Sequence, residues 1–295
     1  MSAAAPHGHQ PYYYVPAPSR HPVMASIGLF FVILGAGQWI NGHGWGAYSL
    51  LAGFVLWAFV LQQWFRQAIG ESEGGLYSDR IDVSFRWSMS WFIFSEVMFF
   101  AAFFGALFYI RTLSVPDLGN PLHKMLWPDF ASGWPSTGPY IRTLFSPMEA
   151  WGIPAINTLL LLSSGVTLTI AHWGLVAGNR TKLKLWLFLT IVLGFTFLGL
   201  QAYEYSHAYH TGLKLSTGVY GSTFFMLTGF HGFHVTIGAI MLSVMLGRVM
   251  KGHFDEHHHF AFEAAAWYWH FVDVVWLFLF TFVYVWGSGP GPYAG

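Results

Sequence analysis

The last long apolar run of the chain opens with Phe262-Glu-Ala-Ala-Ala-Trp-Tyr-Trp-His-Phe-Val-Asp-Val-Val-Trp276. The run before it contains Thr228-Gly-Phe-His-Gly-Phe-His-Val235. Each run is long enough to cross a bilayer, for which about 20 apolar residues suffice, yet each carries ionisable side chains. Because a charged side chain in hydrocarbon costs roughly 2.5 to 3.5 kcal/mol on insertion scales, we expect these groups to face protein, water or a lipid headgroup inside an integral membrane protein.

The composition supports a membrane protein and excludes several other classes. Of the 295 residues, 55% are hydrophobic and only 9% are charged, whereas about a quarter of a soluble domain is charged. The 13 basic and 13 acidic residues balance, so nothing in the charge favours a nucleic-acid partner. The chain contains no cysteine, which excludes disulfides, thiolate ligands and thiol nucleophiles.

Windows of about 20 apolar residues predict seven membrane-spanning helices in an all-α fold. They lie at residues 22–40, 46–65, 85–110, 152–173, 183–205, 221–246 and 262–286. The chain then divides into an N-terminal tail at 1–21, two helices at 22–66, a cytoplasmic connection at 67–84, five helices at 85–286 and a C-terminal tail at 287–295. The Pro-rich segment 114–147 within the five-helix part is expected to be an ordered external loop.

Basic residues gather on one side of the predicted helices. On that side they are Arg20, Arg66, Arg80, Arg86, Arg180, Lys182, Lys184, Arg248 and Lys251. The other side has Arg111, Lys124, Arg142 and Lys214. Because cytoplasmic loops carry the excess of Lys and Arg, the N-terminus is predicted to be cytoplasmic. An odd number of spans then places the C-terminus on the opposite side.

Glu96 lies near the middle of the third predicted span, in Phe94-Ser-Glu-Val-Met-Phe-Phe100. No basic residue follows it before Arg111. A carboxyl group that no cation faces favours its protonated form in hydrocarbon, so Glu96 is a candidate for proton exchange. The alternative is a neutral glutamic acid that hydrogen-bonds to a neighbouring helix, to Ser95 or to water.

The seventh and sixth spans each carry polar side chains on one helical face. Glu263, His270 and Asp273 are spaced by seven and three residues, and His231 and His234 by three. Hydrogen bonding between helices is the commonest use of such groups. His231, His234 and His270 could in principle form a metal or haem site. That alternative is disfavoured because no Glu-x-x-His pair of the diiron type recurs in the spans.

A polar cluster occupies the sixth predicted connection. Its members are Asp255, Glu256, His257, His258 and His259, with Arg248, Lys251 and His253 just upstream. Solvation and weak adventitious metal binding would explain the histidines. The upstream cationic group also suits an anionic lipid headgroup, although an ordinary positive-inside loop explains the charge equally well.

Taken together, these segments resemble subunit III of the haem-copper cytochrome c oxidases. The resemblance rests on Phe94-Ser-Glu-Val-Met-Phe-Phe100, residues 157–172, Tyr203-Glu-Tyr205, Thr228-Gly-Phe-His-Gly-Phe-His-Val235 and residues 258–278. The last block is highly specific, whereas the N-terminal tail and the 114–147 loop carry no such signature. The resemblance implies a respiratory-chain subunit without haem, copper or any catalytic or metal-binding residue of its own. Its partners are the catalytic subunit I, which it contacts directly, and subunit II, in a proton-pumping complex that oxidises cytochrome c and reduces oxygen.

The resemblance also assigns roles to particular residues. In the family, the first two helices splay from the other five to form a V-shaped cleft for structural phospholipids, and the glutamate that matches Glu96 faces it and reacts with carbodiimides. The lipid-binding candidates are Trp64, Arg66, Glu71, Arg248, Lys251 and His253. The polar helix-packing candidates are Glu204, His231, His234, Glu263, His270 and Asp273. A proton antenna that supports proton uptake would comprise Asp255, Glu256, His257, His258 and His259.

Three alternatives to this function stay open on the sequence. They are subunit III of a quinol oxidase, a stand-alone membrane metalloprotein that uses His231, His234 and His270, and a proton-coupled transporter built on Glu96. A quinol oxidase is disfavoured by the seventh-span block and by the count of seven spans. The absence of a targeting peptide favours the bacterial plasma membrane, with the mitochondrial inner membrane as the alternative.

Overall fold

The chain is all-helical with long apolar helices. The computed structural model describes residues 14–141, 145–256 and 258–287. Within these residues, seven helical stretches are long and apolar enough to cross a membrane: His21–Ile40, Trp45–Glu73, Asp79–Asp117, Ile153–Val176, Arg180–His210, Val219–Lys251 and Phe260–Val285. This result confirms the predicted all-α membrane fold with seven spanning helices.

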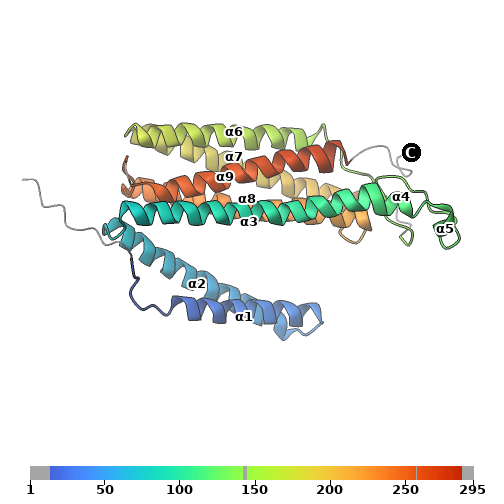
Figure 1. Ribbon diagram of the computed structural model, residues 1–295, viewed down its shortest axis with the longest axis horizontal. Coiled ribbons are helices and arrows are strands. Elements are labelled where there is room, and N and C mark those ends of the chain that lie inside the picture. The colour runs from blue at the N-terminus through green and yellow to red at the C-terminus, as the bar shows by residue number, and fades with distance from the viewer. Residues whose placement is uncertain (1–13, 142–144, 257, 288–295) are drawn as a thin grey trace, which may run out of the picture. The chain divides into compact units, whose positions relative to one another are not determined.

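The α-helices are labelled in Figure 1 in chain order. Their bounds are α1 His21–Ile40, α2 Trp45–Glu73, α3 Asp79–Tyr109, η1 Ile110–Ser114, α4 Val115–Asp117, α5 Pro121–Lys124, α6 Ile153–Val176, α7 Arg180–His210, α8 Val219–Lys251, α9 Phe260–Leu279 and η2 Phe280–Val285, where η1 and η2 are π-helical. Each π segment continues an α-helix without a break. Each of these two spans is therefore one continuous helix.

The second and third helices are longer than their apolar windows predict. α2 continues to Glu73, past the expected end at Arg66, and α3 already begins at Asp79. The third span reaches Asp117 and contains 39 residues, or about 58 Å at 1.5 Å per residue. Since the hydrocarbon core is only about 30 Å thick, part of the expected connection at 67–84 and the start of the expected loop at 114–147 are helical extensions.

The chain divides into two compact units, Met1–Trp87 and Ser88–Gly295. In the first unit, α1 and α2 form a helical hairpin that packs along its length through small residues. A Cβ atom at Gly35 would collide with the backbone nitrogen of Leu50, so only glycine allows the two backbones to approach this closely. The lipid cleft implied by the family resemblance stays a prediction.

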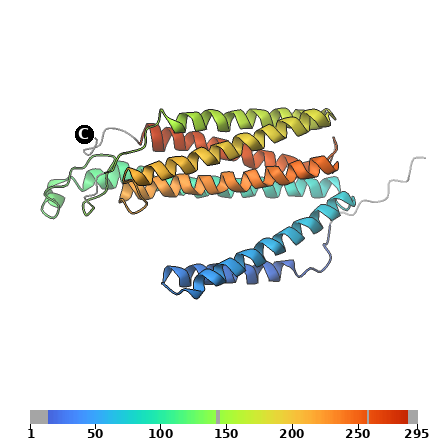
Figure 2. The same ribbon diagram turned by 180° about the vertical axis from the view of Figure 1, so that it is seen from behind.

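The second unit is a helical bundle with α9 at its centre. α6 packs against α7 and α9, and α8 packs against the same two helices; Figure 2 shows α7 in gold beside α8 in orange. In the apolar window of the last span, 56% of the residues are buried, the largest share of any span. Polar groups on α9 must therefore find their partners on neighbouring helices rather than in water.

Trp269 anchors α9 in this bundle. Its side chain is completely buried. A Cβ atom at Gly194 of α7 would lie 2.6 Å from its ring, and one at Gly238 of α8 would lie 2.8 Å from it. The indole therefore fits between two helices at positions where neither has a side chain. This arrangement allows a large aromatic residue at a helix crossing in lipid, where small residues govern close packing.

Candidate functional site

Two tryptophans of α9 bind hydroxyl groups of α6. The Trp269 indole N–H donates to Ser164 Oγ at 2.8 Å, and the Trp276 N–H donates to Thr158 Oγ1 at 2.9 Å. The two bonds lie about two helical turns apart, so they hold the helices in one register. These bonds do not involve the polar residues that the sequence analysis singles out. The pattern that could have indicated the bonds is the presence of Trp in one apolar span and of Ser and Thr at similar spacing in another.

The polar side chains of His270 and Asp273 on α9 face α6. His270 Nδ1 lies 3.6 Å from Asp273 Oδ2, and His270 Nε2 lies 3.5 Å from Thr169 Oγ1. A Cβ atom at Gly165 would collide with Asp273 Oδ2, so the glycine makes room for the carboxylate. In this geometry, His270 and Asp273 join two helices.

His231 bonds to the backbone of α9 from α8. Its Nε2 atom lies 3.2 Å from the carbonyl oxygen of Val272. Since a carbonyl can only accept, Nε2 carries the proton. The ring is completely buried and lies 5.2 Å from the Trp276 ring, centroid to centroid. His231, His234 and His270 do not converge on one point. Within the described ranges, the ligand atoms that do converge belong to another group of His and Glu side chains, at the junction of α6 and α9.

Glu96 pairs with His234. Glu96 Oε2 lies 2.8 Å from His234 Nε2, and this contact joins α3 to α8. The other ring nitrogen, Nδ1, lies 2.6 Å from the carbonyl oxygen of Phe230. Because this carbonyl can only accept, Nδ1 must donate to it. Nε2 and the carboxyl group therefore share one further proton.

The shared proton makes the pair electrically neutral in either arrangement. The proton can sit on Glu96, which then donates to a neutral imidazole, or on His234, which then forms an ion pair with the carboxylate. The His234 side chain is 9% exposed and that of Glu96 is 21% exposed. Aromatic rings of Phe100 and Tyr268 lie 5.0 and 6.3 Å from the imidazole. Both forms thus avoid an isolated charge in an apolar setting.

Glu204 is the most deeply buried acid of the described chain. It lies on α7 and is completely buried, with the Tyr284 hydroxyl facing it. Its neighbour Tyr205 bonds to Thr228 of α8 at 2.6 Å, oxygen to oxygen. Two of the three side chains in the Tyr203-Glu-Tyr205 segment, those of Glu204 and Tyr205, thus point into the bundle.

Glu71 forms a hydrogen-bonded network near the end of α2. Its carboxylate accepts from Gln67 Nε2 and from the Tyr77 hydroxyl, each at 2.8 Å. Burial, and then the hydrogen bond to Glu71, raise the pKa of the Tyr77 phenol, which keeps it a donor at physiological pH. Gln67 Oε1 in turn lies 3.0 Å from His21 Nε2 of α1. The network ties the start of α1 to the end of α2.

Beside this network, Trp64 and Arg66 lie at the surface of α2. The Trp64 ring stacks on His21 with 6.2 Å between centroids, and 40% of the residue is exposed. Arg66 is exposed. An exposed guanidinium is suited to a phospholipid, because arginine forms charge-assisted bonds with its phosphate.

The other three lipid candidates lie near the end of α8 and differ from one another. Arg248 is buried, with its guanidinium carbon 4.4 Å from the centroid of the Phe254 ring. Lys251 is exposed and His253 is half-buried. Arg180 of α7 donates to the Phe254 carbonyl at 2.8 Å, which holds the connection after α8 in place. Lys251 therefore presents its charge to the surroundings more directly than Arg248.

The predicted antenna residues divide into exposed and buried members. The side chains of Asp255 and His258 are 61% and 79% exposed and lie 3.3 Å apart, and Glu256 is exposed as well. His257 lies outside the described residues. His259 is buried and contacts Glu263, so it belongs with the bundle rather than with the surface.

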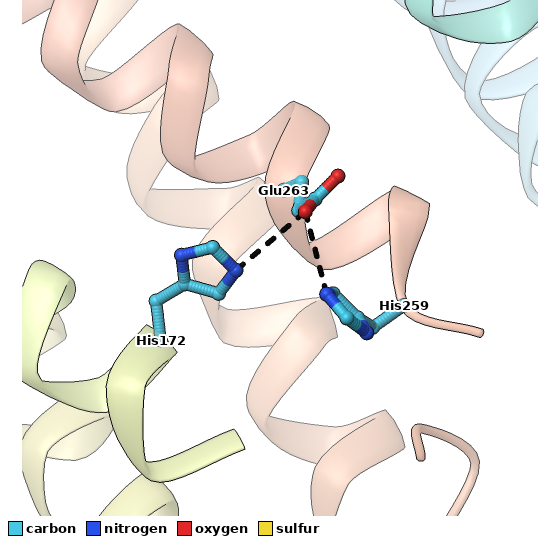
Figure 3. Close-up of side chains that lie close together, drawn as sticks. All are labelled: His172, His259 and Glu263. Atoms are coloured by element: carbon cyan, nitrogen blue, oxygen red, sulfur yellow. Dashed lines mark ion pairs between the residues drawn. The ribbon is translucent and has the colours of Figure 1, made fainter. Parts of the chain in front are cut away.

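His172 joins His259 and Glu263 at the junction of α6 and α9 (Figure 3). Its Nε2 atom lies 3.7 Å from Glu263 Oε1. No sequence motif singles out His172, which lies at the end of a resembling segment. The signal that the sequence does contain is the spacing of four residues between His259 and Glu263 at a helix start, which brings these two side chains together.

Comparisons with known proteins agree with this architecture. The sequence model of the family "Cytochrome c oxidase subunit III" matches residues 10–288. Cytochrome c oxidase subunit 3 of Lumbricus terrestris is 40% identical over 260 residues, which are 88% of this chain and 91% of that protein. The protein of the same name from Phoca vitulina is 43% identical over 257 residues, which are 87% and 90% of the two chains. Because the match extends over nearly the whole chain, this protein belongs to the cytochrome c oxidase subunit III family.

Proposed function

We propose that this chain serves as the third subunit of a cytochrome c oxidase, where it stabilises the catalytic subunit and supports proton uptake without a redox centre of its own. The observation that carries the proposal is the family match over residues 10–288. The names of the relatives also support cytochrome c, rather than a quinol, as the electron donor. Subunits I and II would be the partners and would hold the haem and copper of the complex.

Removal of this chain from the complex tests its supporting role. We expect the remaining complex to keep its haem spectrum and its initial rate of oxygen consumption. During sustained turnover it should lose activity faster than the complete complex, because the support for proton uptake is gone. Oxygen-electrode traces with and without the chain measure this difference. Loss of the haem spectrum together with the chain would instead place a redox centre in it.

The surface of α2 supports a phospholipid-binding role. Trp64 and Arg66 are exposed there, and Glu71 holds the local structure through Gln67 and Tyr77. In this proposal Arg66 binds a headgroup phosphate, Trp64 contacts the glycerol and acyl region of lipid on its own face of the helix, and Glu71 positions the helix end. Lys251 could bind a second headgroup near the end of α8.

Replacing Arg66 with glutamine should remove a bound phospholipid. The neutral amide cannot form the charge-assisted bonds that the guanidinium offers to phosphate, and we expect the retained phosphorus to fall by about one lipid per complex. Phosphorus analysis after a delipidating detergent wash measures this number. Lys184→Gln, an exposed cation on α7, is the control. Equal lipid retention in both variants would contradict the assignment.

The exposed members of the polar connection support the antenna proposal. Asp255 and His258 lie close enough to exchange a proton, and Glu256 adds a second exposed carboxylate. Negative charge at a surface raises the local concentration of cations, including protons. The proposal places this connection and the N-terminus on the cytoplasmic side, because the basic residues gather there. Thiol labelling of single cysteines introduced at residues 214 and 256 of this cysteine-free chain tests the orientation.

Neutralising Asp255, Glu256 and His258 together should slow proton uptake by the oxidase. We expect a decrease of about tenfold at low salt, the lower end of the range for electrostatic focusing, and a smaller decrease at high salt. Stopped-flow uptake measured with a pH-sensitive dye reports the rate. Asp117→Asn, on the predicted opposite side, is the matched control. Unchanged uptake in the triple variant would assign the cluster to solvation alone.

A further inference from the structure

Three potential metal ligands converge between the end of α6 and the start of α9. Glu263 Oε1 lies 3.3 Å from His259 Nε2 and 3.7 Å from His172 Nε2. All three ligand atoms lie within 4.8 Å of one another, and Figure 3 shows both rings pointing toward the same carboxylate oxygen. Within the described ranges, this is the cluster of His, Asp and Glu side chains that meets the requirement for a three-ligand site.

The hydrogen bonding of His259 fixes which of its nitrogens is available. Its Nδ1 atom lies 3.0 Å from the carbonyl oxygen of Asp255. The carbonyl can only accept, so Nδ1 carries a proton, and Nε2, which faces Glu263, is the nitrogen available to a metal ion. A backbone carbonyl that binds the outer nitrogen of a histidine is the usual way in which proteins orient a metal ligand.

His172 directs an unpartnered nitrogen toward the same carboxylate. Its Nε2 atom is buried and has no hydrogen-bond partner, although it is directed toward Glu263. Two imidazole nitrogens and a carboxylate oxygen therefore face one another, and all three bind cations through lone pairs. Their mutual approach is favourable only with a positive species among them, either a proton, held by an imidazole or by the carboxyl group, or a metal ion.

The two separations from the Glu263 oxygen are close to those of a zinc site. With bonds of about 2.0–2.1 Å, the ligand atoms of a tetrahedral zinc site lie about 3.4 Å apart. The Glu263–His259 separation is 3.3 Å, and the Glu263–His172 separation of 3.7 Å needs only a small rotation of one ring. Imidazole and carboxylate are ligands that zinc binds readily. The Phe262 ring, 5.8 Å from that of His172, shields one side of the cluster.

We propose that His172, His259 and Glu263 bind one zinc ion, which links the end of α6 to the start of α9 and keeps a water molecule as its fourth ligand. The His172 side chain is 31% exposed, which leaves a route for the ion. The sequence motifs predict no metal site in this chain, and the three histidines that could in principle form one, His231, His234 and His270, are a different set. The inference does not depend on the proposed role in proton uptake.

Zinc counting on the intact complex tests the proposal. The chain is purified with its partners in mild detergent through a Strep-tag, stripped with a chelator, loaded with zinc sulfate and freed of excess metal by gel filtration. Mass spectrometry of the metal content gives zinc per complex. We expect His172→Asn, His259→Asn and Glu263→Gln each to bind one zinc fewer than wild type. Their dissociation constants for zinc should be at least about a hundredfold larger, since even changes to residues outside the ligand set reduce metal affinity 10- to 100-fold.

His258→Asn is the matched control because it alters the adjacent, exposed histidine. It should retain the wild-type zinc content. All complexes are compared at equal haem content, so a variant that fails to assemble is recognised. X-ray absorption at the zinc edge of wild type should show imidazole ligands at about 2.0–2.1 Å. Equal zinc content in wild type and His259→Asn, or a loss confined to His258→Asn, would show that the cluster is a hydrogen-bonded ion pair and would overturn the proposal.

Discussion

Replacing Gly194 with leucine is expected to remove most of the chain from the assembled complex. A Cβ atom at this position already lies 2.6 Å from the Trp269 ring, and that ring cannot move away because Gly238 contacts it from α8. Inserting extra methylene groups into a packed core costs about 1–3 kcal/mol, and leucine adds four carbon atoms. Since 1.4 kcal/mol corresponds to a factor of ten, the amount of chain that co-purifies with haem should fall at least about tenfold.

Gly199→Leu provides the control on the same helix. A Cβ atom at Gly199 would meet nothing within 4 Å in this chain, so this variant should assemble far better than Gly194→Leu. The comparison separates the loss of close packing from the general effect of replacing a helical glycine. If both variants assemble to the same extent, Trp269 does not anchor the bundle.

Replacing Glu96 with alanine should destabilise the chain much more than replacing it with glutamine. Nδ1 of His234 is committed to the Phe230 carbonyl, so Nε2 depends on Glu96 for its partner. Alanine leaves this buried nitrogen unsatisfied, at a cost of about 1–3 kcal/mol. Glutamine can donate an amide N–H to it and should stay within about 1 kcal/mol of wild type. Thermal release of the chain from the purified complex measures both effects.

The same pair separates structure from proton exchange. Glutamine keeps the hydrogen bond but cannot release a proton, so a stable Glu96→Gln complex with altered proton uptake would assign an exchange role to this carboxyl group. A stable variant with wild-type uptake would leave Glu96 a purely structural partner of His234. Equal stability of the alanine and glutamine variants would contradict the hydrogen-bond arrangement itself.

Sequence patterns predicted the number of helices well but not their ends. Hydrophobicity defines which residues can lie in lipid, and it identified all seven spans. It does not detect helix that continues beyond the bilayer. Polar extensions such as the end of α2 at Glu73 and the start of α3 at Asp79 have helical propensity without apolar character, so the apolar windows stop short of them.

The partners of the buried polar groups could not be predicted from the sequence. Glu96 and His234 are 138 residues apart, and helical periodicity identifies a polar face without specifying which helix covers it. Ser95, considered as a partner for Glu96, instead bonds to the Phe92 carbonyl of its own helix. Arg248 shows the same limitation: its position near a span end does not reveal that the side chain is buried against the Phe254 ring.

Purification of the intact chain with its natural partners is the most direct test of the assignment. A Strep-tagged chain is extracted in mild detergent, and the product is examined by optical absorbance and by mass spectrometry of its subunits. An oxidase subunit III should bring with it haem absorbance and two further membrane subunits in stoichiometric amounts. A colourless, homogeneous preparation of this single chain, able to transport protons by itself in vesicles, would contradict the assignment.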